Sequence, residues 1–247
     1  DVLMIGLLII VVISWLLLRF TIQKNLLVLG LIPVSKRVLE FLLGLIIALG
    51  IHAFFIYLSS VLGLNKYTFK NDFQVILLFK SFIYHLRSAL TEDLIFRGAL
   101  LFLLMYKIGV NKALWFSALL FGFYHWFSYG IWDRDIIVYI YVLLTTSFMG
   151  YVYGYGYAKS GSILLPLGLH LGWNYLATLC CDASPYGELI MNIFEGDHFN
   201  NENLMTWFSL AKGFIPPILI LIFIRLKYGQ EWLIEKKVKK TTDLTRV

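Results

Sequence analysis

The chain has 247 residues, of which 60% are hydrophobic and 17% aromatic, while only 15% are charged. Its mean hydropathy of +0.78 is too apolar for a soluble domain of this length. The composition therefore predicts an all-α fold, a polytopic bundle of transmembrane helices. The only cysteines, Cys180 and Cys181, are adjacent, which excludes a disulfide framework and a zinc-finger site.

Apolar stretches along the chain predict about seven to eight transmembrane spans, because each stretch is close to the roughly 20 residues that cross a bilayer. The first has no basic segment before it and no cleavage site after it, which favours a span over a signal peptide. The chain begins at Asp1 rather than Met, which leaves open a preceding segment. The third stretch is too long for one straight crossing and predicts a long tilted helix or two segments. The stretches are Val2–Leu18, Val38–Leu62, Val75–Tyr106, Ala113–Phe127, Ile136–Ala158, Ile163–Cys181 and Thr206–Ile224.

Basic residues indicate the orientation, because cytoplasmic loops are enriched in Lys and Arg. With the N-terminus outside and the C-terminus inside, the outer side keeps only Lys66, Lys70, Arg134 and Lys212, together with the acidic loop 182–202. The net charge of +6 comes mainly from the inner side and its basic cytoplasmic tail. We expect that tail, residues 227–247, to contact anionic membrane lipids. No folded basic face is predicted, which argues against nucleic-acid binding.

The first of three polar clusters lies in the third apolar stretch and contains Glu92, Asp93 and Arg97. An ionisable group at the bilayer centre costs at least about 3 kcal/mol, so such groups usually mark a functional site. Asp93 and Arg97 are spaced for an ion pair on one helix face, whereas Glu92 lies about 100° away. Ser88 and His85 share the face of Glu92. We therefore expect Asp93 and Arg97 to be structural supports and Glu92 to face a reactant.

The other two clusters each place a histidine one helical turn from a partner. Phe121 precedes His125, so its ring is expected to pack beside the imidazole and limit its movement and its access to water. His170 and Asn174 share a face and present an imidazole and an amide in one direction. Both are hydrogen-bond donors of the kind that a developing oxyanion needs. The glycine- and tyrosine-rich segment 150–166 is interpreted as structural, for close helix packing.

Together these side chains support two chemistries. In the first, Glu92 assisted by His125 acts as a general base on water, while His170 and Asn174 stabilise the oxyanion of a peptide carbonyl. In the second, Glu92, His125 and His170 coordinate a divalent metal such as zinc, which lowers the pKa of its bound water to about 7. The sequence leaves both open, so the cofactor is either none or one metal ion. It contains no His-Glu-x-x-His or Gly-x-Ser-x-Gly motif.

In combination the three clusters resemble the motifs of the CPBP intramembrane proteases. That family includes the type II CAAX prenyl endopeptidases and bacteriocin-processing or immunity proteins of the Abi group. The resemblance covers about residues 75–178, the implied catalytic core of a single membrane-embedded domain, 1–247. It rests on Thr91-Glu92-Asp93-Leu-Ile-Phe96-Arg97-Gly98, Phe121-x-x-x-His125 and Ser160-Gly161-Ser162-x-x-x-Pro166-x-x-x-His170-x-x-x-Asn174.

By position, the resemblance implies that Glu92 and His125 activate water and that His170 and Asn174 stabilise the oxyanion. A metal role has also been proposed for the family. One position departs from the pattern, because the family usually has a second glutamate where this chain has Asp93. We expect activity to survive with Glu92, while the shorter acid changes its pairing with Arg97.

The leading prediction is therefore an intramembrane endopeptidase that acts on a membrane-associated peptide or protein. The alternative is a non-catalytic immunity or scaffold protein that binds a bacteriocin, a receptor or a partner in the same cavity, in which case Glu92 and His125 would be dispensable. A transporter or proton relay would also use intramembrane acids and histidines, but no inverted repeat supports it. Loops rich in Ile, Asn and Lys favour a bacterial source, and hence a bacterial cytoplasmic membrane and a bacterial peptide substrate.

Overall fold

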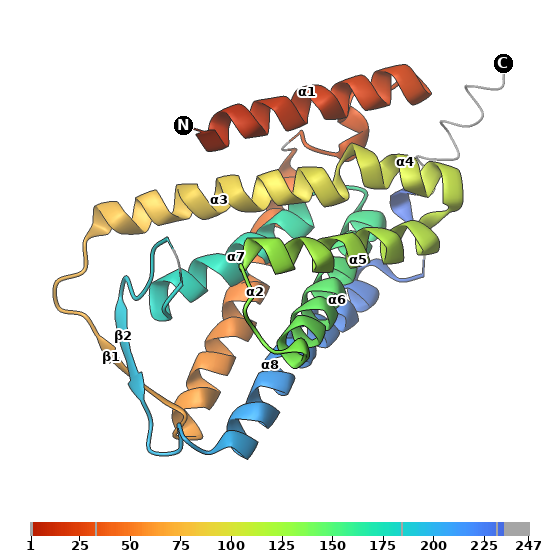
Figure 1. Cartoon of the computed structure of the whole chain (residues 1–247). Coiled ribbons are helices and arrows are strands. Elements are labelled where there is room, and N and C mark those ends of the chain that lie inside the picture. The colour runs from red at the N-terminus through yellow and green to blue at the C-terminus, as the bar shows by residue number, and fades with distance from the viewer. Residues whose placement is uncertain (1, 33, 184, 231, 235–247) are drawn as a thin grey trace.

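The computed structural model describes residues 2–32, 34–183, 185–230 and 232–234 (Figure 1). Helices make up most of this part of the chain, which confirms the predicted all-α class. The helices are α1 (Val2–Ile22), the short 3-10 helix η1 (Leu26–Leu29), α2 (Ser35–Val61), α3 (Val75–Arg97), α4 (Ala99–Ile108), α5 (Val110–Ser128), α6 (Ile136–Ser160), α7 (Leu164–Cys180) and α8 (Glu202–Tyr228).

A small antiparallel sheet was not predicted. Strand β1 (Asn65–Phe69) pairs with β2 (Met191–Glu195) in a continuous register. The strands belong to the loops that follow α2 and α7, so the sheet joins two loops that the sequence assigns to the outer side. A side-chain contact adds to the backbone pairing of the strands, because Nζ of Lys66 donates a hydrogen bond to Oδ1 of Asp197 at 2.7 Å.

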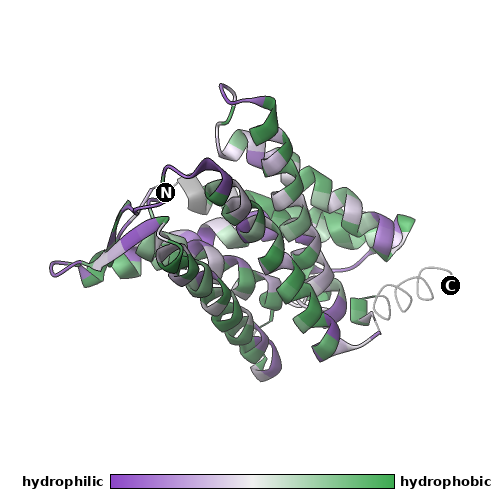
Figure 2. Cartoon of the chain, turned by 90° about the horizontal axis from the view of Figure 1, so that it is seen from below, coloured by the Kyte–Doolittle hydropathy of each residue, from purple (hydrophilic) through white to green (hydrophobic). Residues whose placement is uncertain are grey.

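In the part of the chain that the structure describes, four helices are long and apolar enough to cross a membrane. Their exposed surfaces carry large apolar side chains, such as Phe20 and Leu226, which are 80% and 82% exposed and suit a lipid environment. Hydrophobic residues cover most of the helices, and hydrophilic residues gather in the loops and at helix ends (Figure 2). The predicted count of seven to eight spans is not confirmed, since α4 has only 10 residues and α7 has 17. The four candidate spans are Ile5–Ile22, Ser35–Val61, Ile136–Ser160 and Glu202–Tyr228.

The long third apolar stretch is divided in two at Gly98. This residue has φ −85° and ψ −135°, and the ψ value lies far from that of a helix. A Cβ atom added there would lie 2.1 Å from the carbonyl oxygen of Leu94, so only glycine fits the bend. Of the two predicted alternatives, two segments is therefore correct, and the break follows Arg97 directly.

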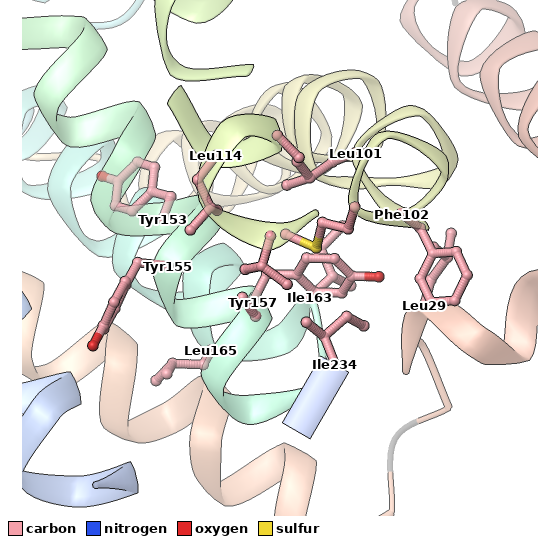
Figure 3. Close-up of a cluster of buried hydrophobic side chains, with 14 of the residues drawn as sticks. Leu29, Leu101, Phe102, Leu114, Tyr153, Tyr155, Tyr157, Ile163, Leu165 and Ile234 are labelled. Carbon is pink, nitrogen blue, oxygen red and sulfur yellow. The ribbon is translucent and has the colours of Figure 1, made fainter. Parts of the chain in front are cut away.

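A buried apolar cluster lies where α4, α5 and α6 meet the start of α7 (Figure 3). It fixes the ends of these helices on the side that the sequence assigns to the cytoplasm. On that side Lys159 donates hydrogen bonds to the carbonyls of Gly229 and Gln230 at 2.9 and 2.8 Å. The predicted basic tail begins here, but its lysine run 236–240 lies outside the described residues. The cluster includes Leu29, Leu101, Phe102, Leu114, Tyr153, Tyr157, Ile163, Leu165 and Ile234.

Helix α7 packs closely against α2 through glycines. A Cβ atom on Gly168 would lie 2.1 Å from the carbonyl oxygen of Phe41, and one on Gly172 would lie 2.6 Å from that of Leu45. His170 is about 200° around the helix from Gly168, so the imidazole faces away from α2. The glycine face thus holds α7 in place while its opposite face carries the third polar cluster.

We predict that Gly168→Ala lowers the free energy of unfolding by about 1–3 kcal/mol, because the added methyl group would push the backbone of α2 away. The matched control is Gly50→Ala on α2, where an added Cβ meets nothing within 4 Å. This control should unfold at or slightly above the wild-type temperature, since alanine favours a helix. Thermal unfolding in detergent measures the melting temperatures of the two variants. Equal melting temperatures for Gly168→Ala and Gly50→Ala would contradict the close packing of α7 on α2.

Candidate active site

The three polar clusters meet in one cavity. Helices α3, α5 and α7 pass close to one another in the bundle (Figure 1), and each contributes one cluster. All four residues predicted to be catalytic line a cavity of about 660 Å³, here called the Glu92 cavity. Its lining residues are Tyr84, His85, Ser88, Glu92, His125, Ser128, Tyr129, His170, Asn174, Ala177, Ala183 and Pro185.

Asp93 and Arg97 form the predicted ion pair, with Arg97 Nη1 donating to Asp93 Oδ1 at 2.8 Å. Both side chains are almost fully buried. Asp93 has a second partner that the sequence did not indicate, because its Oδ1 also lies 3.3 Å from Nδ1 of His170. The shorter acid at this position therefore reaches both Arg97 and the histidine of α7.

Phe121 covers this ion pair as well as the histidine of its own helix. Its ring lies 4.3 Å from that of His125, as the spacing predicts. The guanidinium of Arg97 lies 3.9 Å from the centre of the same ring, within the range of a cation–π contact. Phe121 thus packs on both the buried guanidinium and the imidazole, the contacts expected of a supporting residue.

Hydrogen bonds assign the protons on the two site histidines. His125 Nδ1 lies 2.7 Å from the carbonyl oxygen of Phe121, which can only accept, so Nδ1 carries the proton. His170 Nδ1 faces Asp93 in the same way. In each ring the Nε2 atom is then available to contact a water molecule or a substrate. For His170 this atom lies 3.7 Å from Oε2 of Glu92.

Only one of the two carboxylate oxygens of Glu92 has a hydrogen-bond partner among the described residues. Its Oε1 accepts a long hydrogen bond of 3.5 Å from Ser88, one turn earlier on α3. Its Oε2 is buried and has no hydrogen-bond partner among the described residues. A buried carboxylate oxygen normally has a partner, and a water molecule in the cavity would supply one. The sequence placed Ser88 and His85 on the face of Glu92, and both do line its cavity.

A second cavity of about 330 Å³, the Lys212 cavity, lies on the other side of the histidines. It shares His125, Tyr129, His170 and Asn174 with the Glu92 cavity, so these four residues form the wall between them. Glu92 does not line it. Residues found only on this side include Tyr141, Thr145, Thr146, Tyr153, Trp173 and Lys212.

Sequence reasoning missed two residues of this second cavity. Tyr153 lies in the segment interpreted as purely structural, yet its ring stacks on His170 with centres 5.2 Å apart. Lys212 was assigned to the outer edge of α8, yet it lines the cavity beside Asn174. By contrast His52 has a packing role, because it stacks on Trp173 at 4.3 Å and its Nδ1 contacts the Trp173 carbonyl oxygen.

The metal alternative gains no support from the arrangement of the described residues. Within the described ranges, no group of three or more His, Cys, Asp or Glu side chains could hold a metal ion. In both site histidines Nδ1 is held by Phe121 or Asp93, so Nε2 is the ring nitrogen that a metal ion would have to use. The alternative ligand set of Glu92, His125 and His170 stays a prediction, which the effect of a chelator on cleavage tests.

Comparison with known proteins agrees with the motifs. No curated protein and no solved structure matches the chain. A family model does match, and the matched segment begins just before α3 and ends within α7, so it contains all three polar clusters. Residues 74–176 match the family described as type II CAAX prenyl endopeptidase Rce1-like, which confirms the resemblance and supports a CAAX-type intramembrane protease.

Proposed function

We propose that this chain is an intramembrane endopeptidase that hydrolyses a peptide bond of a membrane-associated peptide or protein. The observation that carries the proposal is that Glu92, His125, His170 and Asn174, from three helices, line one cavity. Its volume of about 660 Å³ is typical of sites that bind a substrate. The family match over residues 74–176 supports the same class of reaction.

In this mechanism the nucleophile is a water molecule bound to Glu92. The free Oε2 atom accepts a proton from the water, whose oxygen attacks the carbonyl carbon of the substrate. Nε2 of His125 has a lone pair because its Nδ1–H is held by Phe121. That lone pair can accept the second hydrogen of the water and orient it. The two residues thus bind and activate the same water, without a metal ion.

The oxyanion that forms would be stabilised by the wall between the two cavities. Asn174 can donate an amide N–H, and His170 can donate from Nε2 when that nitrogen carries a proton. Asp93 holds the imidazole of His170 through Nδ1 at 3.3 Å. When the intermediate collapses, the C–N bond breaks and the leaving amine takes the proton that Glu92 had accepted. The products are a new carboxyl terminus and a new amine.

The test is cleavage of defined peptides by the purified protein in liposomes. We would compare an internally quenched, farnesylated peptide ending in Cys-aliphatic-aliphatic-Ser with its unmodified form, because the family description names prenyl substrates. Mass spectrometry should find one cleavage position, and a strong chelator should leave the rate unchanged. A rate that falls with the chelator and returns with zinc would instead support Glu92, His125 and His170 as ligands. Failure of the folded protein to cleave any peptide would favour the non-catalytic immunity or scaffold alternative.

We also propose that the protein lies in a bacterial cytoplasmic membrane with its N-terminus outside and its C-terminus inside. The sheet agrees with the assignment of sides, because β1 and β2 bring together two loops that are both assigned to the outer side, while the basic residues decide which side is outer. The contact of Lys159 with the residues after α8 joins two segments assigned to the inner side. Labelling of single cysteines placed at Thr68 and Asn111 in intact cells tests it, and labelling of the second but not the first would reverse the orientation.

A further inference from the structure

Lys212 brings an ammonium group to a cavity inside the bundle. It lies on α8, within one of the four candidate spans and ten residues after the helix begins at Glu202. Its cavity of about 330 Å³ is separated from that of Glu92 only by the wall of His125, Tyr129, His170 and Asn174. Lys212 is half-buried, and a cation that is partly shielded from water is stabilised by an anionic partner.

The described part of the protein does not supply that partner. None of its carboxylates lies within 4.0 Å of Lys212, and Lys212 makes no hydrogen bond in that part of the chain. Tyr141 and Thr146, which line the same cavity, donate to the carbonyls of Ser209 and Val142, and neither is hydrogen-bonded to Lys212. The ammonium group is therefore available to an anion that enters from outside the protein.

The position of Lys212 relative to Glu92 indicates which anion this is. The two residues line different cavities, and the residues that the cavities share include the proposed oxyanion donors His170 and Asn174. A peptide whose scissile carbonyl contacts His170 and Asn174 would have the water-activating carboxylate on one side. On the other side, the segment that follows the scissile bond would enter the smaller cavity, with Lys212 facing it.

We infer that Lys212 binds a carboxylate of the substrate on the leaving-group side of the scissile bond, and so determines specificity. This inference rests on the proposed function. A lysine ammonium forms strong charge-assisted hydrogen bonds with a carboxylate inside a protein. The carboxylate can be the C-terminus of a short leaving peptide or the side chain of an Asp or Glu within it. In both cases the small cavity limits the length of the segment that it receives.

Binding to an inactive variant tests the inference separately from catalysis. In the Glu92→Gln background we would measure the dissociation constant of a fluorescent, farnesylated peptide ending in Cys-aliphatic-aliphatic-Ser, with either a free C-terminal carboxylate or a C-terminal amide. A third peptide has the amide and an Asp in place of the last residue. Further variants add Lys212→Met, which keeps the length but removes the charge, or Lys212→Arg. The matched control adds Lys107→Met at an exposed site on α4.

The carboxylate peptide should bind about tenfold or more tightly than the amide, since hydrogen bonds to charged groups have this magnitude. Lys212→Met should abolish the difference, while Lys212→Arg and Lys107→Met retain it. Tight, Lys212-dependent binding of the Asp peptide would identify a side-chain carboxylate as the ligand. Equal affinity of all three peptides, no measurable binding, or a difference that persists in Lys212→Met would overturn the inference. Failure of the proposed function would appear separately, as a wild-type protein that binds the carboxylate peptide but does not cleave it.

Discussion

Replacing Glu92 with Gln is expected to lower kcat for peptide cleavage roughly a hundred- to ten-thousand-fold, the range over which a general base contributes. The amide of Gln has nearly the same shape as the carboxylate but cannot accept a proton from water. The fold should be retained, because Oε2 of Glu92 makes no hydrogen bond in the described part of the protein and its nearest partner, His170, is 3.7 Å away. Initial rates on the cleaved peptide and melting temperatures in detergent measure the two effects.

The matched control is Glu195→Gln, which removes an exposed carboxylate at the end of β2. Its cleavage rate and melting temperature should both equal those of the wild type. If Glu92→Gln also cleaved at the wild-type rate, the endopeptidase mechanism would be wrong and a binding role for the cavity would be favoured. If it instead lost its activity together with its folded structure, Glu92 would be a structural residue.

Contacts within one helix could be predicted from the sequence because residue spacing fixes them. The pair Asp93–Arg97 and the packing of Phe121 on His125 each follow from a separation of one helical turn, and both are present. The contact between Asp93 and His170 joins residues 77 positions apart. No spacing rule predicts it, because it depends on how α3 and α7 cross. The sequence analysis grouped the clusters because all of them lie in apolar stretches, and the family resemblance supported that grouping.

The direction in which individual side chains point could not be predicted from the sequence. Hydropathy averages over a window, so it located α8 but could not tell whether Lys212 faces lipid, loop or cavity. The same averaging gave one long stretch where Gly98 divides two helices. Strands β1 and β2 were missed because each has only five residues and is paired with a strand more than a hundred residues away.

The second large effect is expected at Asp93. The variant Asp93→Ala should lower the free energy of unfolding by about 3–5 kcal/mol, the typical cost of leaving a buried charge without its partner. The charge left behind is Arg97, which is 1% exposed and has no hydrogen bond at Nε or Nη2 within the described ranges. The exposed pair of Lys66 and Asp197 is the control, and Asp197→Ala should leave the melting temperature unchanged.

A double variant separates the two roles of Asp93. In Asp93→Ala/Arg97→Met both buried charges are absent, so this protein should be more stable than either single variant. It nevertheless lacks the acceptor for Nδ1 of His170, so kcat should stay low even where the melting temperature recovers. A recovery of both would mean that Asp93 acts only through Arg97. Stability that fell further in the double variant would show that the pair is not coupled. Recovered stability with lost activity identifies Asp93 as the residue that positions His170 for the oxyanion.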